Sequence, residues 1–298
     1  MIDKGFKSGF VVIAGKPNVG KSSVLNWFFG EKIAIVSPRP ETTRDNIRGI
    51  LTTKDAQAVF IDTPGIHKAH LKLGKEMVKR AKATLEDADL LLVVIDASSG
   101  IYEDDEKLFD SVKELGIPAL ALLNKVDAMK KGKLLPMIED LSRNYHFLDI
   151  IPISALRGDN MDVVKEKVLK DLPEGEKYYP DGQATDRDIK FRVSEIIREK
   201  ALILTRKEVP HSIAVLTEEM IPKEEKGIIY IKACIYTERP SQKAIIIGHG
   251  GSMIKEIGTL ARKEIEDLLK KKVFLDLWVK VIKKWRSDPN AIKRFGLQ

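Results

Sequence analysis

An eight-residue segment near the N-terminus, GKPNVGKS at residues 15–22, fits the pattern G-x-x-x-x-G-K-[ST]. It follows an apolar stretch at residues 10–14 and opens an amphipathic one. In that setting the backbone N–H groups of a glycine-rich loop and the N-terminal end of a helix cradle phosphates. We predict that Lys21 reaches the terminal phosphates and that the Ser22 hydroxyl binds Mg²⁺. The predicted phosphate-binding residues are Gly15, Asn18, Val19, Gly20, Lys21, Ser22 and Ser23.

A second motif, DTPG at residues 62–65, directly follows another apolar stretch and lies 41 residues after Lys21. We expect Asp62 to hold Mg²⁺, through water, and the Gly65 N–H to contact the γ-phosphate. A turn of this composition is common by itself. Its position after the phosphate-binding loop indicates a role in phosphate sensing.

A further pair of motifs indicates which base is bound. NKVD at residues 124–127 follows the apolar residues 119–123, and Ser154, Ala155 and Leu156 follow residues 150–153. The Asp127 carboxylate can accept hydrogen bonds from the N1–H and exocyclic amine of guanine, which adenine does not present in that arrangement. Asn124 would brace the loop, Lys125 would lie along the base, and a backbone N–H of residues 154–156 would bind guanine O6.

These motifs resemble those of the translation-factor-like GTPases over residues 8–172. The resemblance implies that a threonine of PETTRD (residues 40–45) closes over Mg²⁺, and the T-R-D pattern favours Thr43 over Thr42. We therefore expect Lys21, Thr43, Asp62 and Gly65 to act in catalysis and Ser22, Thr43 and Asp62 to bind the metal. Ile66 stands where Ras-like proteins carry a water-orienting glutamine, so we expect slow hydrolysis. Relatives with asparagine at the position of Asn18 can use K⁺; alternatively, Asn18 only forms the turn.

A glycine-rich segment in the second half, IGHGGSMI at residues 247–254, fits the pattern I-G-x-x-G-x-x-I of KH domains. In these domains a GXXG turn clamps about four nucleotides of single-stranded nucleic acid. We expect RNA to contact this turn, in a groove formed by the helix at residues 253–269 and the strand at residues 228–236. The predicted RNA-binding residues are Gly248, His249, Gly250, Gly251, Lys255 and Lys243, and Arg262 is a further candidate.

Several other side chains near this motif have two interpretations. Trp278 and Trp285 could stack on bases, but the alternation of the last strand suits core packing equally well. We interpret Glu195, Glu199, Lys270, Lys271 and Lys272 as solvated helix faces.

The charge distribution agrees with a polyanionic partner for the second half. Residues 1–180 contain 27 basic and 27 acidic side chains, whereas residues 181–298 contain 24 and 17, so the net charge of +7 lies in the second part. A basic face that is merely solvated would give the same count. The single cysteine, Cys234, excludes an internal disulfide and is typical of a reducing, cytoplasmic compartment.

The elements that must position these motifs change character along the chain of 298 residues. Short apolar runs alternate with amphipathic helices up to residue 172, which predicts a parallel sheet covered on both faces, with residues 47–51 as an antiparallel edge strand. A segment rich in Pro, Gly and charge then precedes a helix, two strands, a helical pair and a final strand. The predicted fold is an α/β P-loop domain at residues 1–175, a linker at 176–188, and an α+β type II KH domain with a C-terminal tail at 189–298.

The combination of both halves resembles the Era family, bacterial Ras-like GTPases with a C-terminal KH domain. The resemblance implies binding and hydrolysis of GTP to GDP, binding to 16S ribosomal RNA near its 3′ end, a role in assembly of the small ribosomal subunit, and peripheral association with the inner face of the cell membrane. Two alternatives stay open. The nucleotide could be purely structural, with the KH domain acting alone, or the chain could be a membrane-recruited signalling GTPase coupled to cell-cycle control.

Overall fold

The computed structural model describes residues 5–39, 42–65, 72–130 and 132–297. The chain forms two compact units. The first contains Met1–Ala34, Thr43–Ala69 and Lys75–Asp186, and the second contains Arg187–Gln298 together with Ile35–Thr42 and His70–Gly74, in each case over the described residues. A short stretch of the N-terminal half therefore belongs with the C-terminal unit.

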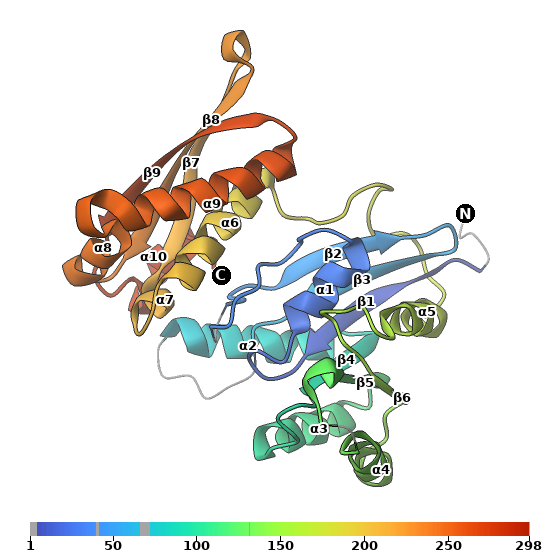
Figure 1. Cartoon of the computed structure of the whole chain (residues 1–298). Coiled ribbons are helices and arrows are strands. Elements are labelled where there is room, and N and C mark those ends of the chain that lie inside the picture. Colours follow the sequence, from blue (N-terminus) through green and yellow to red (C-terminus); the bar gives the residue numbers. More distant parts are fainter. Residues whose placement is uncertain (1–4, 40–41, 66–71, 131, 298) are drawn as a thin grey trace. The chain divides into compact units, whose positions relative to one another are not determined.

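The first unit is built on a sheet with the strand order β2-β3-β1-β4-β5-β6 (Figure 1). Neighbouring strands are parallel except β2 and β3, which form the expected antiparallel edge pair. The strands are β1 (Lys7–Ala14), β2 (Ile47–Thr52), β3 (Ala56–Asp62), β4 (Leu90–Asp96), β5 (Ala119–Asn124) and β6 (Asp149–Pro152). Their carboxyl ends carry the nucleotide motifs, which places those motifs at one edge of the sheet.

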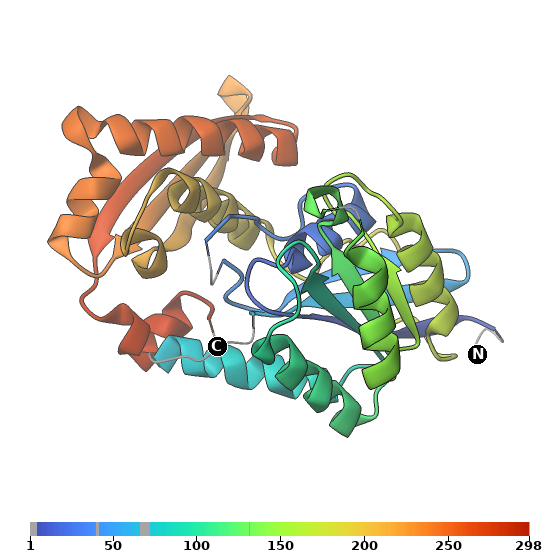
Figure 2. The same cartoon turned by 60° about the horizontal axis from the view of Figure 1, so that its bottom comes forward.

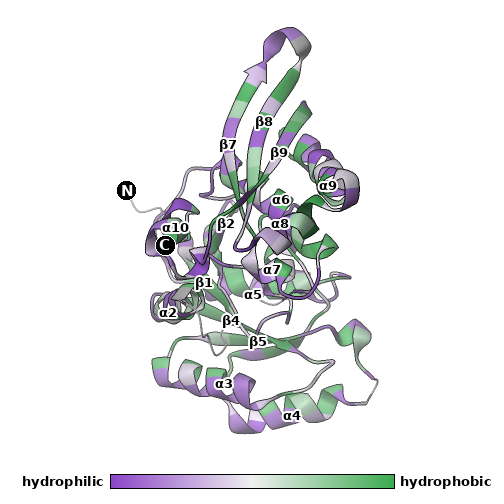
Figure 3. Ribbon diagram, turned by 90° about the vertical axis from the view of Figure 1, so that its left-hand side faces the viewer, coloured by the Kyte–Doolittle hydropathy of each residue, from purple (hydrophilic) through white to green (hydrophobic). Residues whose placement is uncertain are grey.

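Helices cover both faces of this sheet, as the near-continuous apolar strands predict. Helices α1 and α5 pack against β3 on one face, and α2, α3 and α4 share a core with β4 and β5 on the other. The helices are α1 (Lys21–Phe29), α2 (Lys72–Glu86), α3 (Glu103–Leu115), α4 (Leu134–Asn144) and α5 (Met161–Asp171), with a 3₁₀ turn, η1 (Val126–Ala128). Residues 90–95 of β4 are completely buried, and their hydrophobic colour marks the centre of the sheet in Figure 3.

The second unit has the element order expected of a type II KH domain, with short helices added. It contains α6 (Ile189–Leu204), α7 (Val209–Ser212), β7 (Ala214–Lys223), η2 (Glu224–Lys226), β8 (Ile228–Thr237), α8 (Pro240–Ile247), η3 (His249–Gly251), α9 (Ser252–Leu269), β9 (Lys272–Val281), η4 (Trp285–Ser287) and α10 (Pro289–Arg294). Strand β8 lies between an antiparallel β7 and a parallel β9. Figures 1 and 2 both show α9 running along one face of this sheet. Ile257, Ala261 and Ile265 of α9 enter its core.

The structure decides between the two interpretations of each tryptophan, and it corrects the assignment of two glutamates to solvated helix faces. Trp285 is fully buried and its Nε1 donates to the Ser212 carbonyl at 2.8 Å, so it cannot stack on a base. Trp278 is 54% exposed, which contradicts a role in the core. Glu199 is only 2% exposed, and Glu195 is half-buried and pairs with the buried Arg198, so neither is part of a solvated face.

The residues after β9 are a folded part of this unit. η4 and α10 follow the strand, where the sequence suggested only a tail, and the ring of Phe295 packs 5.1 Å from that of Trp285. The one cysteine, Cys234, is buried in β8. Among the helices that the structure describes, none combines the length and the apolar character that crossing a membrane requires.

Candidate nucleotide site and nucleic-acid interface

The phosphate-binding loop connects β1 to α1, as predicted, and its lysine is folded inward. Lys21 Nζ donates to the carbonyl oxygens of Gly15 at 3.0 Å and Lys16 at 2.8 Å, and the residue is 6% exposed. Burial lowers the pKa of Lys21 to about 8, although the nearby Asp62 carboxylate acts in the opposite direction. The Lys21 ammonium therefore lies inside the phosphate-binding loop, where it can exchange its two carbonyl partners for phosphate oxygens.

Gly20 is required in this loop for two reasons. Its φ of +106° lies in the left-handed region, and a Cβ there would approach Asn124 Nδ2 to 2.2 Å. Only glycine permits this close approach between the phosphate-binding loop and the end of β5. Asn18, two residues earlier, also has a positive φ of 63° and is exposed.

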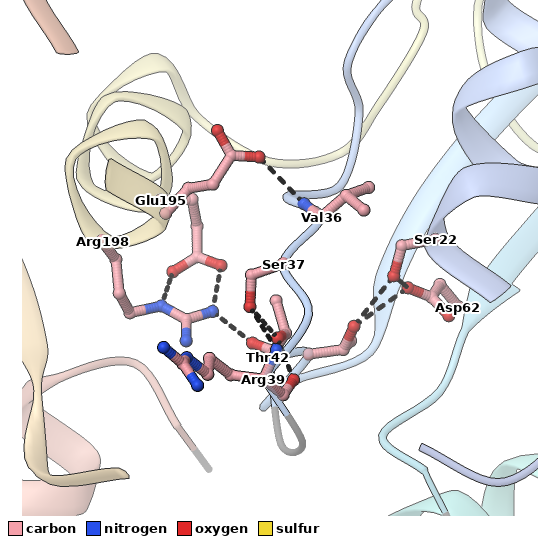
Figure 4. Close-up of polar contacts among 10 residues, drawn as sticks. Ser22, Val36, Ser37, Arg39, Thr42, Asp62, Glu195 and Arg198 are labelled. Carbon is pink, nitrogen blue, oxygen red and sulfur yellow. Dashed lines mark hydrogen bonds and ion pairs between the residues drawn. The ribbon is translucent and has the colours of Figure 1, made fainter. Parts of the chain in front are cut away.

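Three oxygen-bearing side chains converge where Mg²⁺ is expected. Ser22 Oγ donates to Asp62 Oδ2 at 2.6 Å, and Thr43 Oγ1 lies 3.0 Å from Ser22 Oγ and 3.2 Å from Asp62 Oδ2. Figure 4 shows Ser22 and Asp62 facing each other at this point. Asp62 is fully buried, and its pKa is raised because burial outweighs the opposing effects of Lys21 and the two hydroxyls.

This arrangement fits the metal. The second carboxylate oxygen, Asp62 Oδ1, is buried without a hydrogen-bond partner, which is a costly state unless a cation or its water completes it. Among the described residues, no group of three or more His, Cys, Asp or Glu side chains is placed so that it could hold a metal ion by itself. One carboxylate with two hydroxyls suits Mg²⁺, because this ion keeps waters and takes further oxygens from substrate phosphates.

The structure distinguishes the two adjacent threonines. The Thr42 hydroxyl is engaged within its own loop, where it donates to the Arg39 carbonyl at 2.6 Å and lies 2.7 Å from Ser37 Oγ. The Thr43 hydroxyl alone of the two contacts Ser22 and Asp62, as the T-R-D pattern favoured. Gly65 is also close to the phosphate-binding loop, because a Cβ there would lie 2.7 Å from the Pro17 nitrogen. Pro40, Glu41 and Ile66 lie outside the described residues.

The base-recognition motifs are tied to the phosphate-binding loop by a single side chain. Asn124 Nδ2 donates to the Val19 carbonyl at 2.8 Å, and Asn124 Oδ1 accepts from the Ala155 N–H at 3.0 Å. Ser154 Oγ donates to Asp127 Oδ1 at 2.6 Å, which orients the carboxylate. The Leu156 side chain is 86% exposed, so it packs little against this loop.

Two contacts of its Nζ atom hold the Lys125 side chain in place. Its Nζ donates to the Asn18 carbonyl at 2.7 Å and forms an ion pair with Asp96 at 2.6 Å. Burial alone would raise the pKa of Asp96, but hydrogen bonds from Lys125 and Ser98 lower it. Sequence reasoning missed Asp96, although its position at the end of β4, level with Asn124 of β5, was an available signal.

A second contact that the sequence did not predict joins the phosphate-binding loop to α3. Lys16 Nζ forms an ion pair with Asp105 at 2.5 Å and lies 4.6 Å from the centre of the Tyr102 ring. Asp105 is 1% exposed, so the pair is shielded from solvent. Residues 103–106 are four consecutive acids, which is typical of the first turn of a helix, so the sequence did not single out Asp105 as the partner of Lys16.

The GXXG turn of the second unit requires its first glycine. Gly248 has a φ of +74°, and a Cβ there would lie 2.8 Å from the Met253 backbone nitrogen. Gly250 and Gly251 also have positive φ, but open space surrounds their Cβ positions. His249 is exposed. This turn can therefore receive a large, closely approaching group such as a phosphate.

A groove lies next to the turn, but its strand is not the predicted one. Its lining comes from α9 and β9, where β8 was expected, and it encloses about 470 Å³. The reason is the sheet order, which puts β9 at the edge and β8 in the centre. The lining residues are Ile254, Lys255, Gly258, Thr259, Arg262, Phe274, Leu275 and Leu277. Lys255 and Arg262 thus lie in the groove as expected, whereas Lys243 does not.

Known proteins similar to this chain contain both units. Residues 10–125 match the family described as 50S ribosome-binding GTPase, and residues 208–286 match the KH domain family. GTPase Era of Halothermothrix orenii is 46% identical over 291 residues, which cover 98% of each chain. GTPase Era of Caldicellulosiruptor saccharolyticus is 50% identical over 98% of this chain and 97% of its own.

Two solved structures superimpose on almost the whole chain. One is a variant of Aquifex aeolicus Era bound to GDP·AlF₄⁻, and the other is Era in complex with MgGDPNP and nucleotides 1506–1542 of 16S ribosomal RNA. Each has a TM-score of 0.94 at 42% identity and covers 98% of this chain and 99% of its own. With these full-length similarities added to the geometry of both sites, the chain belongs to the Era family of GTPases.

Proposed function

We propose that this protein binds and hydrolyses GTP in its first unit and binds 16S ribosomal RNA near the 3′ end with its second. The observation that carries the nucleotide half is the convergence of Ser22, Thr43 and Asp62 on one point, with Asp62 Oδ1 left without a partner. A solved relative holds MgGDPNP and nucleotides 1506–1542 of 16S ribosomal RNA, which supports both halves.

In the proposed reaction each side chain at the site has an electrostatic or positioning task. Lys21 leaves its two carbonyl partners for the terminal phosphates, and Ser22, Thr43 and Asp62 hold Mg²⁺, which neutralises charge on those phosphates when bound. The Gly65 N–H contacts the γ-phosphate. Asn124, Lys125, Asp127 and the backbone of residues 154–156 select guanine.

We further propose that K⁺ assists hydrolysis through Asn18. The residue lies in the phosphate-binding loop, has a positive φ of 63° and is exposed. A monovalent cation there would compensate for the missing water-orienting glutamine at position 66.

For RNA, the proposed path runs over Gly248, His249, Gly250 and Gly251 and along the groove between α9 and β9. Glycines let phosphates approach the backbone, Lys255 and Arg262 neutralise them, and the apolar lining from Ile254, Leu275 and Leu277 receives unstacked bases. Lys243 keeps a supporting electrostatic role outside the groove. The biological role that follows is in assembly of the small ribosomal subunit.

The function is tested by crosslinking the protein to RNA in cells and sequencing the bound RNA. We expect enrichment of the 3′ end of 16S ribosomal RNA over other ribosomal segments. In vitro, the full-length protein with GDPNP should bind an RNA of nucleotides 1506–1542 more tightly than a permuted RNA of equal length. Equal binding of the two RNAs would contradict the assignment.

The proposal also includes a location and a domain division. We propose a cytoplasmic protein that associates peripherally with the inner face of the cell membrane, with a GTPase domain at residues 1–175, a linker at 176–188 and a KH domain at 189–298. Sedimentation with anionic vesicles, with and without competing RNA, tests the membrane part. Binding to vesicles that RNA does not reduce would favour the membrane-recruited signalling GTPase.

A further inference from the structure

The described part of Ile35–Thr42 is held by the second unit, although it precedes the metal-binding Thr43. Three backbone groups mark the attachment. The Val36 N–H donates to Glu199 Oε1 at 2.9 Å, Arg39 Nη2 donates to the Thr205 carbonyl at 2.9 Å, and Arg198 Nη2 donates to the Thr42 carbonyl at 2.6 Å. Glu199 and Arg198 both belong to α6, and Thr205 directly follows it.

A second partner on the same helix, Glu195, orients the Arg198 side chain. Its Nε and Nη2 donate to the two carboxylate oxygens of Glu195 at 2.7 and 2.6 Å, a bidentate pair that fixes the plane of the guanidinium (Figure 4). The residue is 3% exposed. Because the same Nη2 also donates to Thr42, the fork and the loop carbonyl are held in one rigid arrangement.

Glu199, the second anchor, is equally constrained. It is 2% exposed and pairs with Lys200, which also contacts Glu264 of α9. Because Lys200 neutralises the buried Glu199 carboxylate and holds it in place, this carboxylate stays in position to accept the Val36 N–H. Two neighbouring residues of α6 therefore hold the loop at both ends, at Val36 and at Thr42.

The hold at Thr42 determines where Thr43 lies. The Thr42 carbonyl is part of the planar peptide group that joins it to Thr43, so fixing that oxygen fixes the orientation of the next residue. The Thr43 hydroxyl lies within hydrogen-bond distance of both Ser22 and Asp62. We propose that Arg198, oriented by Glu195, is a positioning residue that keeps Thr43 at the metal site, an inference that rests on the proposed role of Thr43.

The test compares nucleotides that need Thr43 with one that does not. In the full-length protein, Arg198→Ala should weaken GDPNP binding and raise the Mg²⁺ concentration for half-maximal hydrolysis, each about 10-fold, because one charge-assisted hydrogen bond is lost. GDP affinity should stay within about twofold, since the role proposed for Thr43 concerns Mg²⁺ bound together with a γ-phosphate, which GDP lacks. Lys190→Ala, an exposed cation of the same helix, should change none of these quantities.

Two milder variants test the same contact in case the loss of the buried arginine in Arg198→Ala weakens the fold. Arg198→Lys retains one donor for the Thr42 carbonyl and should recover part of the GDPNP affinity. Glu195→Gln leaves Arg198 in place but releases its fork, and should give a smaller shift in the same direction. A parallel loss of GDP and GDPNP affinity in these variants would overturn the inference, because it would indicate a general structural defect.

Thr43→Ala separates this inference from the proposed function. If it lowers the GDPNP-to-GDP affinity ratio while Arg198→Ala leaves the ratio unchanged, Thr43 acts as proposed and Arg198 does not position it. If Thr43→Ala leaves the ratio unchanged, the metal role of Thr43 fails and the positioning role fails with it.

Discussion

The amide of Asn124 donates to the carbonyl of Val19 across 105 residues of sequence, at a distance of 2.8 Å. Val19 belongs to the loop that holds phosphates, whereas Asn124 ends the strand that carries the base-recognition motif. The same side chain accepts a hydrogen bond from Ala155. The three loops of the nucleotide site are thus held together before any ligand binds, which favours tight and selective binding.

Base selectivity should follow the chemistry of one carboxylate. Asp127→Asn is expected to lower GTP affinity by about 100-fold or more and to create a preference for xanthosine triphosphate, because the amide can donate to the extra carbonyl of xanthine. Competition titrations against labelled GDP measure both changes. Asp104→Asn, an exposed acid of α3, is the matched control and should bind GTP normally. Wild-type protein that bound ATP as tightly as GTP would contradict the assignment of the pocket.

GTP binding should take up a proton through Lys21 at alkaline pH. The lysine has a pKa of about 8 in the nucleotide-free protein because it is buried, and phosphate charge raises that pKa on binding. Below pH 7 Lys21 is already protonated, so no uptake is expected, whereas uptake should approach one proton near pH 9. Affinity should therefore fall as pH rises above 8.

Calorimetry in buffers with different ionisation enthalpies counts these protons directly. Guanosine, which offers the same base without phosphates, is the matched ligand and should give no uptake attributable to Lys21. The assignment fails if GTP and guanosine show the same proton balance at pH 9.

Hydrolysis should be faster in KCl than in NaCl at equal ionic strength, and the difference should depend on Asn18. Asn18→Gly is the informative change, because glycine adopts the observed φ of 63° without strain but has no amide oxygen. We expect the ratio of rates in the two salts to fall to about one. Equal rates for the wild-type protein in both salts would discard the K⁺ proposal and leave Asn18 as a turn former.

RNA binding should be sensitive to negative charge in the GXXG turn. Gly250→Asp and Gly250→Asn introduce side chains of the same size at an open position with a φ of +57°, which both residues tolerate. The aspartate should reduce affinity for single-stranded RNA at least about 10-fold more than the asparagine, because it repels the clamped phosphates. GTP affinity should stay near wild type in both.

Filter binding at several salt concentrations, with circular dichroism to confirm folding, measures this difference. The reciprocal variant Lys21→Ala should lose GTP binding and retain RNA binding. Normal RNA binding by a folded Gly250→Asp protein would exclude the GXXG turn as the RNA site.

Most of the nucleotide site could be predicted because its determinants are local. Each motif follows an apolar run, and parallel strands bring their carboxyl ends to one edge, so Lys21, Asp62, Asn124 and Ser154 had to converge. The element order of the KH unit was also predictable, because the patterns that mark its helices and strands are local in the sequence. Ile257, Ala261 and Ile265 recur every four residues in the sequence, and these three side chains form the buried face of α9.

What could not be predicted depends on contacts between distant segments. Glu199 has the polar character of a solvated helix face, but it is buried and accepts the Val36 N–H, 163 residues away in the sequence. The groove was expected beside β8, and only the order of the sheet shows that β9, at its edge, lines the groove together with α9. Trp285 is buried through a hydrogen bond to Ser212, a partner that lies 73 positions earlier.

The burial of Cys234 has a practical consequence for spectroscopy. Because the chain has one cysteine and its thiol is enclosed in β8, maleimide reagents should leave the folded native protein almost unmodified. A cysteine introduced at an exposed position would then be the one reactive thiol, with no need to remove the natural residue. Fluorophore or spin-label pairs could be attached in this way to the GXXG turn and to the nucleotide-binding unit, and the distance between them could be followed through a cycle of GTP hydrolysis.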